Sequence, residues 1–480
     1  MAICCRIIIL VLFSVCFSLP AYSAIYEVGE GKTFANIGDV PWESMNAGDQ
    51  VLIHWRQQPY KEKWVIAVQG TEQQPFVVRG VPNQYGDLPI IDGRDATTRS
   101  QINFWNEDRG VIKIGGANTP AVDTPTWIVL ENLEIRSGRT PYQFTGRSGL
   151  TGYGSNAASI YVENGQNVTL RNCILRDSGN GLFVSHASKN VLVEGCWIYD
   201  NGIEGSIYEH NTYTAAIGMV YQFNYLGPLR ANCLGNNLKD RSAGTVVRYN
   251  WIESGNRQLD LVDAEDSTDL VNHPSYRKTF VYGNILIEPD GAGNSQIVHY
   301  GGDSGDTPIY RKGTLYFYNN TVVSTRAGNT TLLRLSTNEE TCDCRNNILY
   351  VTEPGSRLAL LASSGMLYLS HNWLKTGWQD SHDGLTGVIY NEGGNVTGES
   401  PGFVDAPAQD YHLNSASPCI NAGTSLHPEA YALSHQYVKH RASELRPSSG
   451  PLDIGAFEIQ SPDGTPPATP KNLRIISRNH

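Results

Sequence analysis

A short phrase recurs along the chain and constrains the fold more than any other feature. Each copy has residues of alternating polarity, then an Asn or Gly, then an apolar residue or a second Asn. The equivalent positions are Leu133, Cys173, Cys196, Asn250, Asn284, Asn320, Asn347 and Asn372, with spacings of 40, 23, 54, 34, 36, 27 and 25 residues. Short spacings of 23 to 27 with irregular excess are typical of a solenoid whose coils follow a fixed path and release loops of variable length.

Five of these positions are asparagine, in a chain of 480 residues that holds 37 Asn and 48 Gly. Both residue types are poor helix formers and good turn formers, so all-α folds and coiled coils are excluded. Stacked Asn side chains can pass amide hydrogen bonds from coil to coil, and Asn tolerates the left-handed backbone that a tight turn needs. We interpret these Asn as inward-facing ladder residues rather than as ligands.

Coils of this length, built from three short strands, predict an all-β, single-stranded right-handed parallel β-helix. Residues 26–29, a short helix around 34–45 and residues 47–53 resemble the N-terminal cap of pectate-lyase-like β-helix proteins. Residues 410–423 and 453–458 resemble the closing coils of the same superfamily. The resemblance implies one β-helix domain over residues 24–460 with an N-terminal helical cap. It does not identify the reaction, because this architecture also occurs in hydrolases, epimerases and adhesins.

Both ends of the chain have a separate character. Arg6, the apolar run 7–19 and the small residues before 24 predict a cleaved signal peptide over 1–23, and hence a secreted or periplasmic protein without membrane insertion. The Pro-rich tail 461–480 predicts a linker that resembles the start of a fibronectin type III module. Six cysteines remain after cleavage, which predicts buried thiols or one or two disulfides rather than a metal site.

Charge limits the partners of the chain. The formal net charge is −11, and no run of five basic residues occurs, so we expect no nucleic-acid partner. We expect a monomer that acts on a polysaccharide.

A second alignment of the coils places titratable residues along one sheet. Equivalent strand positions run from apolar through charged residues and back to apolar, and a titratable band in the middle of a solenoid is typical of a substrate groove. The predicted substrate-binding residues are His186, Arg248, Arg257, Asp260, His299 and Arg334.

Lys239 and Arg241 are the predicted catalytic pair within this band. Because they are two residues apart on a strand, their side chains face the same way, while Asp240 faces the other. Two neighbouring cations repel each other, so we expect the pKa of Lys239 to be lowered and its neutral amine to act as a base. The alternative is a solvated pair balanced by Asp240.

The 54-residue interval before Asn250 predicts a long loop over this site. It contains His210 and Tyr213, which we predict to be acid/base groups because His titrates near neutrality and Tyr can return a proton to a glycosidic oxygen.

The band also resembles the site of lysine-dependent β-helix polysaccharide lyases. That resemblance implies that Lys239 removes the C5 proton of a uronate and that Arg241 assists the leaving group. It also implies a Ca²⁺ cofactor, for which Glu204, Glu209, Asp260 and Asp263 are the available ligands. The chain departs from the family because Asn236 and Asn237 replace the two glutamates that precede the lysine there.

Three functions fit these features. The first is a secreted lyase that cleaves an acidic polysaccharide by β-elimination, with a C5-epimerase as a variant of the same chemistry. The second is a glycoside hydrolase that draws two carboxylates from Asp260, Asp263, Glu265 and Asp266. The third is a non-catalytic glycan-binding or adhesin β-helix, in which exposed aromatic side chains along several coils would stack on sugars.

Overall fold

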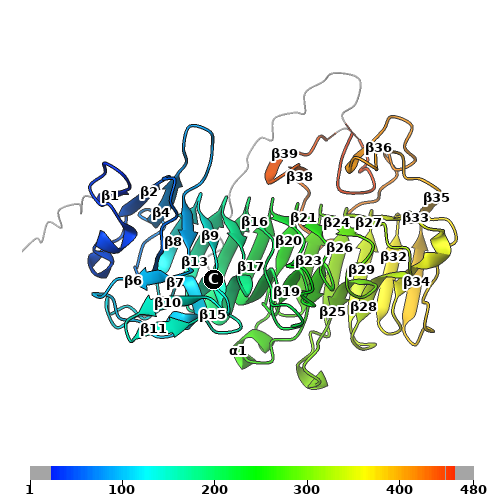
Figure 1. Cartoon of the computed structure of the whole chain (residues 1–480). Coiled ribbons are helices and arrows are strands. Elements are labelled where there is room, and N and C mark those ends of the chain that lie inside the picture. The colour runs from blue at the N-terminus through cyan, green and yellow to red at the C-terminus, as the bar shows by residue number, and fades with distance from the viewer. Residues whose placement is uncertain (1–22, 449, 460–480) are drawn as a thin grey trace, which may run out of the picture.

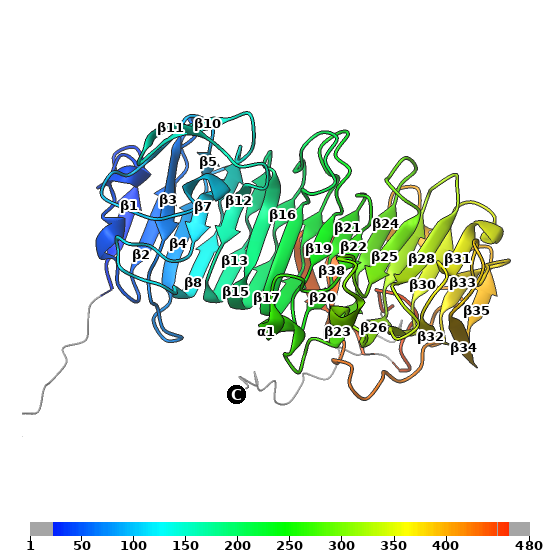
Figure 2. The same cartoon turned by 90° about the horizontal axis from the view of Figure 1, so that it is seen from below.

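The computed structural model describes residues 23–448 and 450–459 and places them in a parallel β-helix. Each strand of a coil pairs in parallel with the equivalent strands of the preceding and following coils, as Trp251 does with Tyr225 and Ile285. Figures 1 and 2 show the coils stacked from the N-terminal end to the far end of a single solenoid. The strand rows form three faces.

The first face is a sheet of eleven strands. These are β5 (Ile90–Asp92), β9 (Glu134–Arg136), β14 (Ile174–Arg176), β16 (Trp197–Ile198), β18 (Tyr225–Leu226), β21 (Trp251–Glu253), β24 (Ile285–Glu288), β27 (Thr321–Ser324), β30 (Ile348–Val351), β33 (Trp373–Lys375) and β35 (Val396–Gly398).

The second and third faces join through two long strands, β15 (Asn180–Glu194) and β17 (Thr212–Gln222), which cross the corner between them. The second face also holds β1 (Ile25–Val28), β2 (Gln50–His54), β4 (Phe76–Val81), β8 (Thr126–Glu131), β13 (Gln166–Arg171), β20 (Val246–Arg248), β23 (Lys278–Tyr282), β26 (Thr314–Tyr318), β29 (Thr341–Arg345), β32 (Met366–Ser370) and β34 (Val388–Gly393). The third face also holds β3 (Glu62–Ile66), β7 (Gly110–Ile114), β12 (Ala158–Val162), β19 (Leu238–Asp240), β22 (Leu259–Leu261), β25 (Gln296–Tyr300), β28 (Thr330–Leu335) and β31 (Leu358–Leu361).

The remaining elements are short and lie outside the three faces. Strands β6 (Ala96–Thr98), β10 (Gln143–Gly146) and β11 (Gly149–Gly152) form a small lobe at the N-terminal end. The helical elements are α1 (Thr268–Val271) and the single 3-10 turns η1 (Ile37–Asp39), η2 (Trp42–Ser44), η3 (Glu107–Arg109), η4 (Thr307–Ile309) and η5 (Gly355–Arg357). The helix expected around 34–45 is therefore present only as η1 and η2.

An asparagine ladder runs along the corner between the second and first faces, as predicted. It consists of Asn224, Asn250, Asn284, Asn320, Asn347, Asn372 and Asn395. At each step the side-chain Nδ2 donates to the Oδ1 of the next asparagine, over 2.9 to 3.3 Å, and the backbone N–H donates to the same oxygen. Because the members from Asn224 to Asn372 are fully buried, each amide must find its partners within the solenoid.

The left-handed backbone of the turn lies one residue earlier than expected. Tyr249, Asn319 and His371, which precede ladder residues, have φ of 54°, 49° and 52°. The ladder asparagines are therefore selected for their amide hydrogen bonds and not for their backbone conformation.

The prediction of a long loop before Asn250 is wrong, because the interval contains a complete coil. Strands β17 and β18 form it, and Asn224 takes the ladder position, 28 residues after Cys196 and 26 residues before Asn250. This copy of the repeat was not predicted from the sequence. As a result, Tyr213 lies within the sheet itself, while His210 lies just before β17, in the segment that connects β16 to β17.

The C-terminal segment does not form closing coils. After β35 the chain turns back along the outside of the solenoid, where β36 (Phe403–Asp405) pairs with β37 (Asp410–Leu413) and β38 (His435–Val438) pairs with β39 (Ala442–Leu445), both antiparallel. Figure 1 shows β38 and β39 beside the middle of the solenoid. Aromatic contacts attach the segment, with Trp251 packed against Tyr437 and His440.

Several sequence expectations concern residues beyond the described parts. The predicted signal peptide, apart from its last residue, lies outside the described residues. The predicted linker 461–480 lies entirely outside them. Within 23–448 and 450–459, no helix is long and apolar enough to cross a membrane. The six described cysteines are free thiols, so no disulfide forms among them.

Replacing one ladder residue should destabilise the solenoid. In Asn320→Ala, the backbone N–H of Asn284 and the carbonyl of Val281 lose their buried partner. Because unpaired buried groups cost about 1–3 kcal/mol each, we expect a loss of about 3 kcal/mol in the free energy of unfolding. Calorimetry would measure it against Asn118→Ala, an exposed position with no side-chain hydrogen bond in the described structure. Equal melting temperatures for the two variants would contradict the structural role of the ladder.

Candidate active site

One row of outward-facing side chains crosses the third face, with one residue from each coil. Strand register aligns Tyr161, Phe183, Tyr213, Lys239, Asp260, His299 and Arg334. The predicted band is therefore formed, but its register shifts at β15. Phe183 and not Ser185 is equivalent to Lys239, because β15 continues past the corner and its pairing with β17 is irregular there. The row is aromatic toward the N-terminal coils and charged in the middle.

Lys239 lies between two carboxylates. Its Nζ is 2.9 Å from Asp260 Oδ2 and also binds Asp303 Oδ2. Burial and Arg241 oppose the charged amine, but the two carboxylates outweigh them, so the pKa of Lys239 lies above its ordinary value. The expected lowering of this pKa is wrong, since the sequence showed the neighbouring cation but not the carboxylates of other coils.

Asp260 is the buried hub of the row. Besides Lys239, it accepts a hydrogen bond of 2.7 Å from Asn236 Nδ2 and contacts His299 Nδ1 at 2.8 Å. Although burial disfavours the anion, Lys239 and His299 hold the pKa of Asp260 well below its usual range. Burial lowers the pKa of His299, whose Nε2 lies 2.9 Å from Ser336 Oγ. With a side chain only 2% exposed, Asp260 positions its neighbours and does not reach a ligand.

Arg241 faces the same way as Lys239, as the strand alternation predicts. Its Nε donates to Tyr213 Oη at 2.8 Å, and Nη1 donates to the carbonyl of Asp263. Its Nη2 lies 2.8 Å from Glu265 Oε1 and 2.9 Å from Asp303 Oδ1. One guanidinium therefore holds two carboxylates from different loops.

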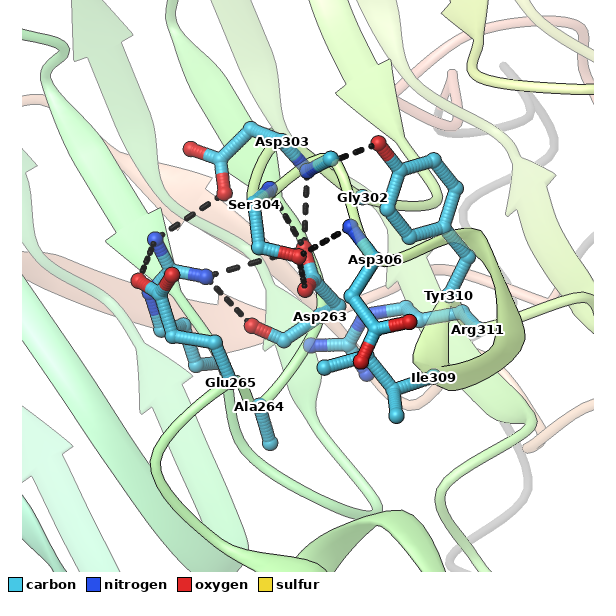
Figure 3. Close-up of polar contacts among 12 residues, drawn as sticks. Asp263, Ala264, Glu265, Gly302, Asp303, Ser304, Asp306, Ile309, Tyr310 and Arg311 are labelled. Carbon is cyan, nitrogen blue, oxygen red and sulfur yellow. Dashed lines mark hydrogen bonds and ion pairs between the residues drawn. The ribbon is translucent and has the colours of Figure 1, made fainter.

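Asp303 is the residue that the sequence analysis missed. It lies in the loop between β25 and β26, and Asp263 shapes this loop by accepting hydrogen bonds from the Asp303 and Ser304 backbone and from the Ser304 hydroxyl (Figure 3). The Asp303 side chain is 29% exposed, so it can reach a ligand. A signal existed, since the segment 301–306 is the longest polar Gly/Asp/Ser run that follows a strand of the band.

Glu265 and Asp303 are pushed toward opposite protonation states. Burial and the nearby carboxylates of Asp303, Asp263 and Asp266 raise the pKa of Glu265, against the opposing effect of Arg241. Burial also disfavours the Asp303 anion, but Lys239 and Arg241 overcome it and lower the pKa of Asp303. The two carboxyl groups thus differ in proton affinity while sharing one cation.

The two predicted acid/base groups take different places. Tyr213 contacts Arg241 and faces the groove, and burial raises its pKa, so it stays a phenol. His210 is 1% exposed, its Nδ1 accepts from the Asn236 backbone, and burial lowers its pKa to about 3. His210 therefore supports the ring of Tyr213, with centroids 5.7 Å apart, instead of reaching a ligand.

Beside Arg241, the aromatic part of the row lines a cavity of about 150 Å³. Phe183 stacks on Tyr213 and meets Tyr161 edge-on, with ring centroids 5.1 and 5.6 Å apart. His186 and Arg109 also line this cavity, together with Ala264, Asp266 and Ser267 before α1 and Leu270 within it. His186 is thus placed in the groove as expected.

The other predicted substrate-binding residues divide between two faces. Arg257 lies beside the row, where it donates to Gln296 Oε1 at 2.8 Å and is 3.9 Å from Asp260. Arg334 is exposed next to His299. Arg248 is not part of the groove, because it lies on the second face and binds Gln222 and Tyr282.

The four residues assigned to calcium do not fit a calcium site. In the described ranges, no three His, Cys, Asp or Glu side chains are arranged to hold a metal ion. Glu204 accepts from Asn232 in an exposed turn, whereas Asp260 pairs with the Lys239 ammonium and contacts His299 Nδ1. Asp263 is occupied by the loop of Asp303. Asp260 and Asp263, which already bind cations or N–H and O–H donors, lack free oxygens for Ca²⁺. Glu209 keeps one buried oxygen without a partner, but burial raises its pKa and no set of further His, Cys, Asp or Glu ligands surrounds it in the described ranges.

Removing the Lys239 amine should make stability depend on pH. In Lys239→Met, the buried Asp260 loses its main cation, which should cost about 3 kcal/mol at neutral pH. Its pKa then rises, so protonation relieves the cost and the deficit relative to wild type narrows as pH falls toward the ordinary aspartate value of 3.8. Denaturation at a series of pH values would measure this.

Two matched variants isolate the charge effect. Lys239→Arg keeps a cation, and Lys239→Met with Asp260→Asn removes the unpaired anion, so both should recover part of the lost stability. A deficit that is constant with pH, with no recovery in the double variant, would indicate lost packing instead.

No protein-family model matches the chain, and no curated protein matches it. Solved structures do resemble it. Pectate lyase Pel9A matches with a TM-score of 0.46 and 12% identity over 92% of this chain and 97% of that chain. An alginate lyase from Paenibacillus sp. str. FPU-7 matches with 0.43 and 11% over 68% and 92%. A GH136 lacto-N-biosidase from Eubacterium ramulus matches with 0.49 and 13% over 78% and 68%. The likeness is one of fold, and the named activities differ.

Proposed function

We propose that this protein is a glycan-cleaving enzyme that binds a polysaccharide along the row of the third face and hydrolyses it with Asp303 and Glu265. The observation that carries the proposal is the carboxylate pair on Arg241 Nη2, with the pKa of Glu265 raised and that of Asp303 lowered. An acid and an ionised partner beside each other are what glycosidic hydrolysis requires.

The spacing of the pair favours a retaining mechanism. The two bound oxygens lie 2.8 and 2.9 Å from the same nitrogen, so they are at most about 6 Å apart. Retaining hydrolases hold their carboxyl groups about 5–5.5 Å apart, whereas inverting ones leave about 6.5–9.5 Å for a water molecule.

Each residue then has a defined task. The protonated Glu265 gives its proton to the glycosidic oxygen, while an Asp303 oxygen forms a bond to the anomeric carbon and the alcohol leaves. The Glu265 carboxylate next takes a proton from water, which attacks the same carbon and releases Asp303. Lys239 and Arg241 keep Asp303 ionised and oriented. The aromatic row offers a stacking surface for neighbouring sugars.

The lysine-base mechanism has less support. Lys239 is a cation with a raised pKa, Arg241 stays protonated, and His210 is buried. The bases that contact Arg241 at the groove are therefore the carboxylates of Asp303 and Glu265. The charged side chains gather in the middle of the row, whereas an adhesin would show exposed aromatic side chains along many coils. This arrangement also favours catalysis over adhesion.

β-Elimination is the second candidate. The observation in its favour is the hydrogen bond from Arg241 to Tyr213 Oη, which positions a phenol to protonate a leaving oxygen while Asp303 takes the C5 proton of a uronate. A C5-epimerase would share the proton abstraction without cleavage.

Product analysis distinguishes these reactions. With a panel of neutral and acidic polysaccharides, hydrolysis should release reducing ends with retained anomeric configuration. New absorbance at about 235 nm would instead indicate the unsaturated ends that a lyase produces. Glu265→Gln and Asp303→Asn should each lower kcat about 10²- to 10⁴-fold. Asp306→Asn, an exposed position in the same loop, is the matched control. Full activity of Asp303→Asn would exclude the proposed roles.

The pH dependence should follow the two shifts. Glu265 must be protonated, so activity falls as pH rises through its pKa, which lies above the ordinary 4.5. Asp303 must be ionised, so activity falls as pH drops through its pKa, which lies below the ordinary 3.8. We expect an optimum on the acid side of neutrality in kcat/KM profiles. An optimum in the alkaline range would favour elimination.

A further inference from the structure

We propose that the cavity beside Arg241 is a subsite for a sugar that carries an anionic substituent, a carboxylate or a sulfate ester, and that Arg109 binds this group. The inference rests on the proposed function, because it takes the row of the third face to be the path of a glycan. It names the residue that would select the substrate.

Arg109 has no anionic partner among the residues that the structure describes. It ends the turn η3, and its guanidinium carbon lies 5.0 Å from the ring centroid of Tyr161 and 4.8 Å from that of Phe183. Its Nε is buried without a hydrogen-bond acceptor, and in residues 23–448 and 450–459 no ion pair forms to its side chain. A desolvated guanidinium nitrogen without an acceptor costs free energy that an incoming anion would recover.

The cations beside the cavity and the carboxylate pair are already neutralised or hydrogen-bonded, and the exposed Arg334, next to His299 at the far end of the row, does not line the cavity. Arg241 binds Asp303 and Glu265, and Lys239 binds Asp260 and Asp303. Arg257 donates to Gln296. Arg109 therefore brings to the cavity guanidinium donors that no other described residue uses.

The surroundings suit an anionic sugar ring. Tyr161, Phe183 and Tyr213 provide an aromatic surface, and Leu270 adds an apolar side chain to the lining. Asp266 also lines the cavity, so an anion must bind on the Arg109 side, away from this carboxylate. The two rings beneath Arg109 restrict its side chain, which reduces the entropy lost on binding. Carboxylates and sulfates both match the planar donor fork of arginine.

The location of the cavity next to the carboxylate pair determines how Arg109 would affect substrate specificity. Tyr213 and Arg241 line this cavity, and Arg241 also binds both members of the carboxylate pair, so the subsite adjoins the cleaved bond. A polymer with an acidic residue at that subsite is bound by Arg109, whereas a neutral residue leaves the guanidinium unpaired. Arg109 would thus control KM more than kcat.

Binding to the full chain with Glu265→Gln, measured by calorimetry, tests the subsite without cleavage. The probes are oligogalacturonate and chondroitin sulfate oligosaccharides, with their carboxyl-reduced and desulfated counterparts. Adding Arg109→Gln should weaken binding of at least one anionic probe about 10-fold or more and change its neutral counterpart less than about twofold. Arg109→Lys should recover part of the loss. Arg79→Gln, on the second face, should change neither.

The outcomes separate the two proposals. The chemical change that abolishes the Arg109 dependence, carboxyl reduction or desulfation, identifies the anionic group. Equal weakening of charged and neutral probes, no weakening, or no binding of any probe would overturn the subsite. If wild type cleaves none of the polymers but Arg109-dependent binding is observed, the hydrolase proposal fails and the subsite stands. If wild type cleaves an acidic polymer and Arg109→Gln leaves its KM unchanged, the subsite fails and the hydrolase stands.

Discussion

The amide-to-amide hydrogen bonds of the asparagine ladder set the register on which the rest of the structure depends. In a parallel stack, a shift of one residue would turn every side chain to the opposite side of its sheet. Because each ladder Oδ1 accepts from both the backbone N–H and the side chain of the previous asparagine, each coil is fixed relative to the next at the same corner. This fixed corner lets Tyr213, Lys239, Asp260 and His299, from four different coils, form one row.

Within that row, charge neutralisation decides what each group can do. Lys239, Arg241, Asp260 and Asp303 form one network in which every charge has an opposite partner. Burial alone would make both Asp260 and Asp303 weaker acids, yet the cations reverse that effect for both. Glu265 has a smaller share of the positive charge and more anionic neighbours, so its pKa moves the other way. The opposite pKa shifts of Glu265 and of the two aspartates therefore arise from the positions of these residues and not from their residue types.

Much of this was predictable from the sequence, and the failures have physical causes. The ladder, the shared direction of Lys239 and Arg241 and the alignment of Asp260, His299 and Arg334 all follow from fixed periods of two residues and of one coil. The coil of Asn224 was missed because its interval was assigned to one long loop. The sign of the Lys239 pKa shift could not be predicted, because Asp260 and Asp303 come from other coils and their distances are a tertiary property. Asp303 itself was missed because its loop has no repeat to align.

The tripeptide Lys239–Asp240–Arg241 shows why the position of Asp303 is well determined. The two cations point outward and bind the Asp303 carboxylate at the start of its loop. Asp240 points inward, where it accepts from Thr214, Ser242 and Thr245 and meets Arg311, at the end of the same loop, with both side chains fully buried. Arg311 also donates to the carbonyl of Ser242 at 2.8 Å. Because residues 239–241 bind the loop near both of its ends, Asp303 is held against Lys239 and Arg241, and the rigid solenoid fixes the position of a carboxylate that can still reach a ligand.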